Sequence, residues 1–265
     1  MSMRRLLLSL VVGWFAAPLR AELPELLKEA GLKASQGMER WAYTETTVVT
    51  DHKGRSKGET IVRVDPSKPY AEQFTPLKIN GKAPTEKQLK QYRSKGEQHG
   101  RELERRWHAT TQGQPSEPPR LTINGTSSVA DLDHIAVTEE NAGSITYEIP
   151  LRSDGKQRLP MEKFQLLVRV SKEQRALENL SLRLKSPWRT KLIVKINSGV
   201  LGVDFTTVDP QFAPEITAIH GDFSASVMFI KVAANVEMTR TDFQRVKPYD
   251  EHFNVKVGPL QFLSF

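Results

Sequence analysis

The second half of the chain alternates apolar residues with other residues, which is typical of β-strands that have one buried face. Short turns are predicted at Ser171 to Arg175, at Ser186-Pro187 and at Asn197-Ser198-Gly199. Turns this short make consecutive strands antiparallel neighbours, so the pattern predicts a meander. The apolar stripes run from Phe164 to Val170, Leu180 to Leu184, Trp188 to Ile196, Leu201 to Phe205 and Met228 to Met238, and further strands are expected at Phe243 to Val246 and Phe253 to Val257.

The first part of the chain mixes two periods. Leu23 to Met38 has helical spacing behind Pro24, a favoured first-turn residue, and Gly31 is a natural stop, so a short helix is predicted. Trp41 to Val49 and Glu59 to Val64 alternate on either side of a Gly- and Lys-rich turn. These two segments predict a β-hairpin.

The segment that follows the hairpin is predicted to contain turns and a second helix. Asp65 to Pro84 is rich in Pro and Gly and is expected to form turns around one short strand, with Asn80-Gly81 as the tightest turn. Thr85 to Trp107 has a helical pattern, but Gly96 and Gly100 each weaken a helix by about 1 kcal/mol relative to Ala. A broken helix over a sheet edge or mouth is therefore expected.

The N-terminus has the order of a secretory signal peptide. Arg4 and Arg5 precede an apolar run from Leu6 to Ala17, and small residues lead to a predicted cleavage point after Ala21. The run is too short to cross a bilayer as a helix. Residues 1–21 are thus expected to be removed on export, and the predicted location is the periplasm.

The remaining residues, 22–265, are expected to form one mainly β domain with a mobile loop at 110–128. An antiparallel sheet of about ten strands curls, so a curved sheet or incomplete β-barrel is predicted, with an N-terminal helix and a helical lid segment. There is no Cys, so the fold must be held by its core. The formal charge is +7, and three of the basic residues lie in the signal, so nucleic acid is not expected as a partner.

The order of an N-terminal helix, a hairpin carrying Trp41, a Pro/Gly break with a helix and then a meander resembles the LolA/LolB-like family of periplasmic lipoprotein carriers. The resemblance is architectural and spans roughly 25 to 257. It implies an incomplete barrel around an apolar cavity that holds acyl chains of lipoproteins or other amphiphiles. The charged segment 85–107 and the loop 110–128 depart from the family pattern.

An apolar stripe on the concave face is the predicted ligand site, because ligand pockets are mostly apolar and concave. The same residues could instead form a filled core against the helices. The predicted set is Trp41, Tyr43, Phe164, Leu166, Val168, Leu182, Leu184, Trp188, Leu192, Val194 and Phe205.

The positions that alternate with this stripe are basic, with no acid among them, and could favour an anionic membrane surface or an envelope protein. The alternative is an ordinary solvated face that Lys and Arg protect from aggregation. The basic set is Arg169, Arg183, Lys185, Arg189, Lys191 and Lys195.

Signals for catalysis are few, and no cofactor or metal is expected. His220-Gly221-Asp222 offers two ligand types, fewer than a zinc site usually has. The nucleophile and phosphate-binding motifs are absent, and there is no thiol. His134 lies close in sequence to four acids, Asp131, Asp133, Glu139 and Glu140.

The sequence therefore predicts a non-catalytic carrier of a lipid, a lipoprotein acyl chain or another hydrophobic ligand. The alternative from another class is an envelope assembly factor with a filled core and a basic docking face. A third is a hydrolase that uses His134 or His220. A continuous cavity would favour the first, a packed interior the second, and a His-carboxylate pair in a cleft the third.

Overall fold

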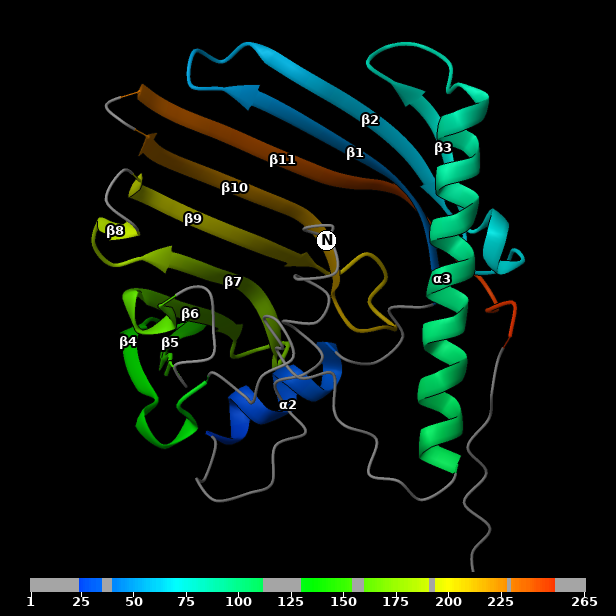
Figure 1. The fold of residues 1–265 in the computed structure, drawn as a ribbon. Helices are drawn as coiled ribbons and strands as arrows, with labels where there is room; N and C mark the ends of the chain where they lie inside the picture. Colours follow the sequence, from blue (N-terminus) through cyan, green and yellow to red (C-terminus); the bar gives the residue numbers. More distant parts are fainter. Residues whose placement is uncertain are drawn as a thin grey trace, which may run out of the picture.

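A computed structural model describes residues 24–34, 40–111, 130–153, 160–190, 194–227 and 230–250. Its strands form one large antiparallel sheet that is not closed into a barrel (Figure 1). The predicted mainly β fold with an N-terminal helix is confirmed. The signal peptide, most of the 110–128 loop and the strand expected at 253–257 lie outside the described residues.

The sheet has its first and last strands side by side in the middle. The order across it is β3-β2-β1-β11-β10-β9-β7-β6-β5-β4, and the short β8 pairs with β9. The two edges, β3 and β4, are therefore consecutive along the chain. The strands are β1 (Trp41–Asp51), β2 (Ser56–Val64), β3 (Phe74–Ile79), β4 (Ala136–Glu140), β5 (Ser144–Pro150), β6 (Phe164–Ser171), β7 (Ala176–Leu184), β8 (Trp188–Thr190), β9 (Val194–Thr206), β10 (Glu215–Val227) and β11 (Ile230–Arg245).

Helix α2 (Glu25–Ala34) lies on one face of the sheet, against β6 and β7. Its buried stripe includes Leu27 and Ala30, which join strands β5, β6, β7, β9 and β10 in the main hydrophobic core. Gly31 was expected to end the helix, and that prediction is wrong. Gly31 lies inside the helix on its buried face, and the helix continues for three more residues.

Helix α3 (Glu86–Thr111) is continuous, so the predicted break at its glycines is wrong. The ring of Tyr70, in the short helix η2 (Tyr70–Glu72), lies against Gly100, where an added Cβ would be 2.4 Å from ring atoms. A Cβ on Gly96 would be 1.9 Å from the Tyr70 carbonyl oxygen. The glycines thus provide room for close packing, which offsets their cost to the helix.

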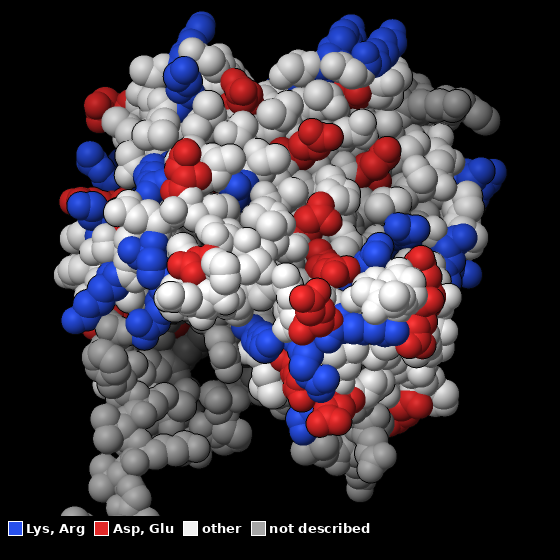
Figure 2. Space-filling view, turned by 180° about the vertical axis from the view of Figure 1, so that it is seen from behind, with Lys and Arg blue, Asp and Glu red and all other residues white. Residues whose placement is uncertain are grey.

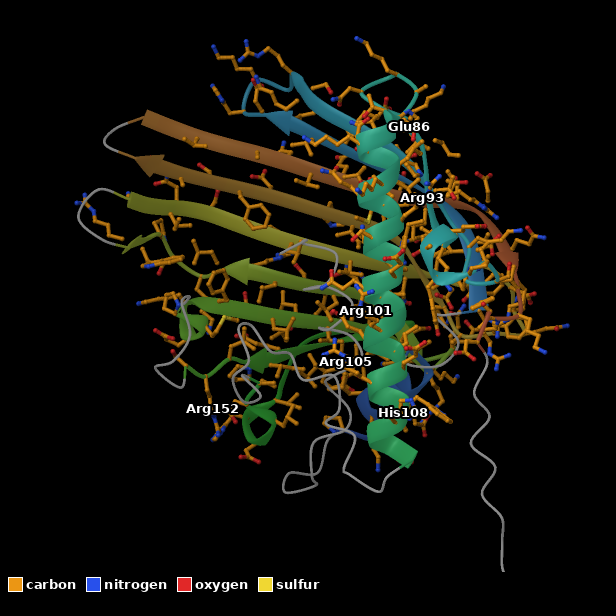
Figure 3. The ribbon with its side chains drawn as sticks, turned by 45° about the vertical axis from the view of Figure 1, so that its right-hand side comes forward. Glu86, Arg93, Arg101, Arg105, His108 and Arg152 are labelled. Atoms are coloured by element: carbon orange, nitrogen blue, oxygen red, sulfur yellow. The ribbon has the colours of Figure 1, made fainter. Side chains whose placement is uncertain are left out.

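The same helix begins at a capping box and runs along the edge of the sheet. The Thr85 backbone N–H donates to Gln88 Oε1 at 2.8 Å, and the Gln88 N–H donates to Thr85 Oγ1 at 3.4 Å. Lys95 Nζ lies 5.2 Å from the centroid of the Phe74 ring in β3. In Figure 3, α3 runs from Glu86 at the top to His108 near the bottom, and Arg152 lies to the left of the helix. Helix α3 therefore covers edge strand β3.

The β1–β2 hairpin is confirmed, and so is the turn at Asn80-Gly81, where both residues have positive φ, 52° and 73°. The predicted strand from Trp188 to Ile196 is wrong. Strand β8 ends at Thr190, and β9 begins at Val194 and runs through the predicted turn Asn197-Ser198-Gly199. A register shift in β9–β10 accommodates this stretch, and Asn197 Nδ2 donates to Ser226 Oγ at 2.9 Å.

The remaining short helices are η3 (Leu132–His134) and η4 (Met161–Lys163). Strands β4 and β5, which follow η3 along the chain, were not predicted, and neither was β10. Among the described helices, none is both long and apolar enough to span a membrane.

Candidate ligand-binding site

The face of the sheet that carries the core is called the inner face here, and its residues lie in rows across neighbouring strands. One row joins Leu180, Val203, Ile219, Met238 and Thr47. The next row joins Leu182, Leu201, Gly221, Val236 and Val49. The third contains Gly199, Phe223 and Ala234, and the fourth contains Trp188, Ile196, Ala225 and Val232.

The part of the inner face near α2 is packed. Leu166 is fully buried, Val168 is 1% exposed and Phe205 is 7% exposed, and all three belong to the core cluster with α2. Phe164 and Leu182 pack partly against the same cluster. These five members of the predicted ligand set therefore serve, wholly or in part, as core residues.

The opposite end of the inner face is less covered. We call it the hairpin end, because the β1–β2 turn after Asp51 and the β10–β11 turn after Val227 both lie there (Figure 1). Phe223 is 39% exposed and Val232 is 54% exposed. We call the apolar residues of this region the apolar floor. It consists of residues that are not buried, namely Val49, Trp188, Ile196, Phe223, Ala225, Val232, Ala234 and Val236.

Two glycines lie beneath the Phe223 ring in this floor. A Cβ on Gly221 would be 2.8 Å from Phe223 Cε2, and one on Gly199 would be 3.4 Å from Phe223 Cδ1. The aromatic ring thus lies over backbone where other residues would place a side chain. At these two positions the ring adds apolar surface to the floor, and no side chain projects beneath it.

Trp188 links the predicted ligand set to the apolar floor. Its ring packs edge-on against Phe164, with centroids 6.1 Å apart. Trp188, Phe164 and Leu184 are all half-buried, so they border both the packed part and the floor. Leu192 and the Val194 side chain lie outside the described residues.

Trp41 and Tyr43 are not part of the floor, because they lie at the other end of the strands. The Trp41 ring packs edge-on against Phe212 at 5.7 Å and against Phe243 at 6.2 Å between centroids. The Arg245 guanidinium lies 4.1 Å from the Phe212 centroid and 5.0 Å from that of Trp41. These residues form an aromatic and arginine cluster of their own.

Buried charges accompany this cluster. Arg240 Nε lies 3.3 Å from Glu45 Oε2, both side chains are buried, and the guanidinium lies 4.5 Å from the Tyr43 centroid. Burial raises the pKa of Glu215 to about 7, although Arg240 and Arg245 oppose that shift. The buried Trp41 indole N–H lies near this carboxyl but has no hydrogen-bond partner by geometry among the described residues.

The basic set is distributed over the outer face, with acids from neighbouring strands among it. Arg169 pairs with Glu178 at 3.0 Å, and Lys185 Nζ lies 3.9 Å from Glu148. In the view from behind, Lys and Arg side chains are interspersed with Asp and Glu (Figure 2). Periodicity along single strands could not show these acids, because they come from adjacent strands.

The other basic residues of the set lie towards the hairpin end. Arg183 Nε donates to Ser181 Oγ at 3.0 Å. Arg189 is directly opposite Lys195 in the β8–β9 pair, and both are exposed. Lys191 lies outside the described residues.

The two histidine candidates lie in different elements, His134 in η3 and His220 in β10, and each contacts a carboxylate. His134 Nδ1 is 3.0 Å from each Asp131 oxygen, and Arg152, which also pairs with Asp131, holds the pKa of that carboxyl below its usual range. His220 Nδ1 is 3.5 Å from Asp204, on the outer face. Asp133 lies near Arg152, and Glu139 and Glu140 lie in exposed edge strand β4. Within the described residues, no group of three side chains could hold a metal ion.

Phe223, Val232 and Val236 were not in the predicted ligand set. The predicted apolar stripe from Met228 to Met238 contains two of them, Val232 and Val236. What the sequence could not show was that α2 covers the β6–β7 side of the face.

Comparisons with protein-family models, with curated proteins and with solved structures find no match for this chain.

Proposed function

We propose that this protein is a non-catalytic carrier that binds an acyl chain or a similar elongated apolar ligand on the apolar floor. The observation that carries the proposal is that apolar side chains on the inner face continue beyond the part that α2 covers, as far as Asp51 at the end of β1. Phe223 and Val232 are exposed there, although their own strands, β10 and β11, also contribute residues to the core. Apolar ligands gain about 0.8 kcal/mol for each CH₂ group that they bury, so such a face favours their binding.

The dimensions of the floor suit a chain-like ligand. From Val232 to Val236 it follows β11, and across the sheet it extends from Trp188 in β8 to Val49 in β1. Strands lie about 4.8 Å apart, so four strand spacings, from β8 through β9, β10 and β11 to β1, give a width of about 19 Å. A flexible chain can follow this curved surface without a closed cavity. The architectural resemblance to LolA/LolB-like carriers and the predicted export to the periplasm agree with this proposal.

The first test is native mass spectrometry of the protein purified without detergent, followed by lipid extraction. We expect a co-purifying amphiphile, and we expect dansyl-undecanoic acid to bind with increased fluorescence. A bare mass together with no binding of this probe would refute the carrier proposal.

A matched pair of variants assigns the binding to the floor. Val232→Glu places a carboxylate on the exposed inner face, whereas Ala233→Glu places one on the opposite face of the same strand. We expect Val232→Glu to weaken probe binding at least about tenfold, because an unpaired carboxylate is costly to desolvate. Ala233→Glu should bind as the unaltered protein does. Equal binding by the two variants would exclude the floor as the site.

A second candidate function, an envelope assembly factor, is favoured by the packing of Leu166, Val168 and Phe205 against α2. In that case the inner face would serve stability alone, and the charged surface would engage a partner. The same mass spectrum distinguishes the two functions, because an assembly factor needs no bound amphiphile.

A further inference from the structure

The hairpin end combines two surfaces that lie close together. One is the apolar floor on the inner face. The other is a set of exposed basic side chains at the strand ends, which we call the basic rim. It consists of Lys53, Arg55, Lys57, Lys185, Arg189 and Lys195.

We propose that the hairpin end docks on the surface of an anionic lipid bilayer, with the basic rim against the headgroups and the apolar floor opening towards the acyl chains. This inference rests on the proposed carrier function and names the surface with which the carrier exchanges its ligand.

The basic rim has an excess of positive charge that its own contacts do not neutralise. Asp51 accepts from Arg55 and Lys57, with closest N–O distances of 2.7 Å and 3.4 Å. Glu148 is the acid near Lys185. Among the described residues, these two acids are the ones that pair with the rim, against six basic side chains.

The pair Arg189 and Lys195 points to an anionic partner independently. The two residues are directly opposite each other in the β8–β9 ladder, and like charges in that arrangement destabilise a sheet. Among the described residues, neither makes an ion pair. An anionic surface would remove the repulsion, so the arrangement fits a role in docking better than one in stability.

The apolar residues beside this pair place the floor at the same end. Trp188 and Ile196 each lie one residue further from the β8–β9 turn, and they share a row with Val232. In Figure 3, nitrogen-tipped side chains also project from the β1–β2 hairpin at this end. A bilayer that contacts the basic side chains would therefore meet the exposed end of the floor. An acyl chain could then pass from the bilayer to the floor without crossing water.

The test is vesicle co-sedimentation of the full chain, with vesicles of phosphatidylcholine alone or with added phosphatidylglycerol. We expect binding to the anionic vesicles only, decreasing as salt is raised. Each basic side chain near an anionic bilayer strengthens binding about fivefold, so the double variant Arg189→Glu/Lys195→Glu should bind at least about twentyfold more weakly. The matched control is Lys90→Glu/Arg93→Glu, an equal change of charge at exposed positions of α3.

Binding of dansyl-undecanoic acid in solution separates this proposal from the carrier function. The rim variant should keep its affinity for this probe, which shows that it is folded and that the floor is intact. If the rim variant and the α3 variant bind anionic vesicles equally well, or if the unaltered protein binds neutral vesicles as strongly as anionic ones, the docking proposal is wrong. If the unaltered protein does not bind the probe at all, the carrier function is refuted instead.

Discussion

Two regions of the inner face belong to one sheet and follow the same alternation, but only one of them is packed. Near α2, Leu166 and Val168 are buried, whereas at the hairpin end Phe223 and Val232 remain exposed. The difference lies in a helix of ten residues that covers β6 and β7. Whether an apolar part of this sheet is buried or exposed thus depends on whether a helix lies on it.

The largest expected effect tests the packed end. Leu166→Ala removes a fully buried side chain, and we expect the free energy of unfolding to fall by about 2–5 kcal/mol. Val232→Ala, at the hairpin end, should change it by less than about 0.5 kcal/mol, because the side chain is already exposed. Urea unfolding of both variants measures the difference. Similar losses would show that the two ends are equally packed.

The next effect concerns the charges buried near Trp41. The ordinary pKa of a Glu carboxyl is 4.5, and that of Glu215 is about 7, so the folded protein holds this proton more tightly than the unfolded chain. The stability that this proton contributes is full below about pH 4.5 and is lost as the pH rises to about 7, which lowers the free energy of unfolding by up to about 3 kcal/mol.

Glu215→Gln should remove this pH dependence and stabilise the protein at about pH 8 relative to the unaltered chain. The measurement is urea unfolding at about pH 5 and about pH 8. Glu237→Gln, at an exposed position of β11, serves as the control and should leave the dependence unchanged. A Glu215→Gln variant that is less stable at both pH values would show that the carboxylate stabilises the cluster.

The smallest effect concerns the floor itself. A Cβ on Gly221 would meet the end of the Phe223 ring, which is exposed enough to move aside. We expect Gly221→Ala to weaken binding of dansyl-undecanoic acid about fourfold, the equivalent of one lost CH₂ contact. Its unfolding free energy should change by less than about 1 kcal/mol. A large loss of stability with unchanged binding would place Gly221 in the core.

Sequence reasoning succeeded where the signal is local. The β1–β2 hairpin, the Asn80-Gly81 turn and the meander follow from alternation and turn chemistry. It failed where distant residues decide. Gly96 and Gly100 weaken an isolated helix, but the ring and backbone of Tyr70 use the space that they leave. The prediction of a turn at Asn197 was also wrong, because a bulge can keep a turn-like sequence inside a strand.

The candidate site was predicted in part for the same reason. Alternation identified an apolar inner face, including Trp188 and Leu184, but it gave no information on which strands α2 would cover. The acids beside Arg169 and Lys185 were missed because Glu178 and Glu148 belong to neighbouring strands. Register across a sheet depends on pairing, which one strand's pattern does not contain.

The pairing of β1 with β11 has a consequence for how the molecule is assembled. Trp41 is opposite Arg245, so the two halves of the sheet join only when the last strand is in place. Contacts this distant in sequence slow folding, because a long loop must close before they form. A circular permutant that joins the present ends and opens the chain between β3 and β4 would run through the sheet strand by strand from one edge to the other. The order of synthesis would then match the order of neighbours, whereas in the native order the two halves of the sheet cannot join until β11 has been made.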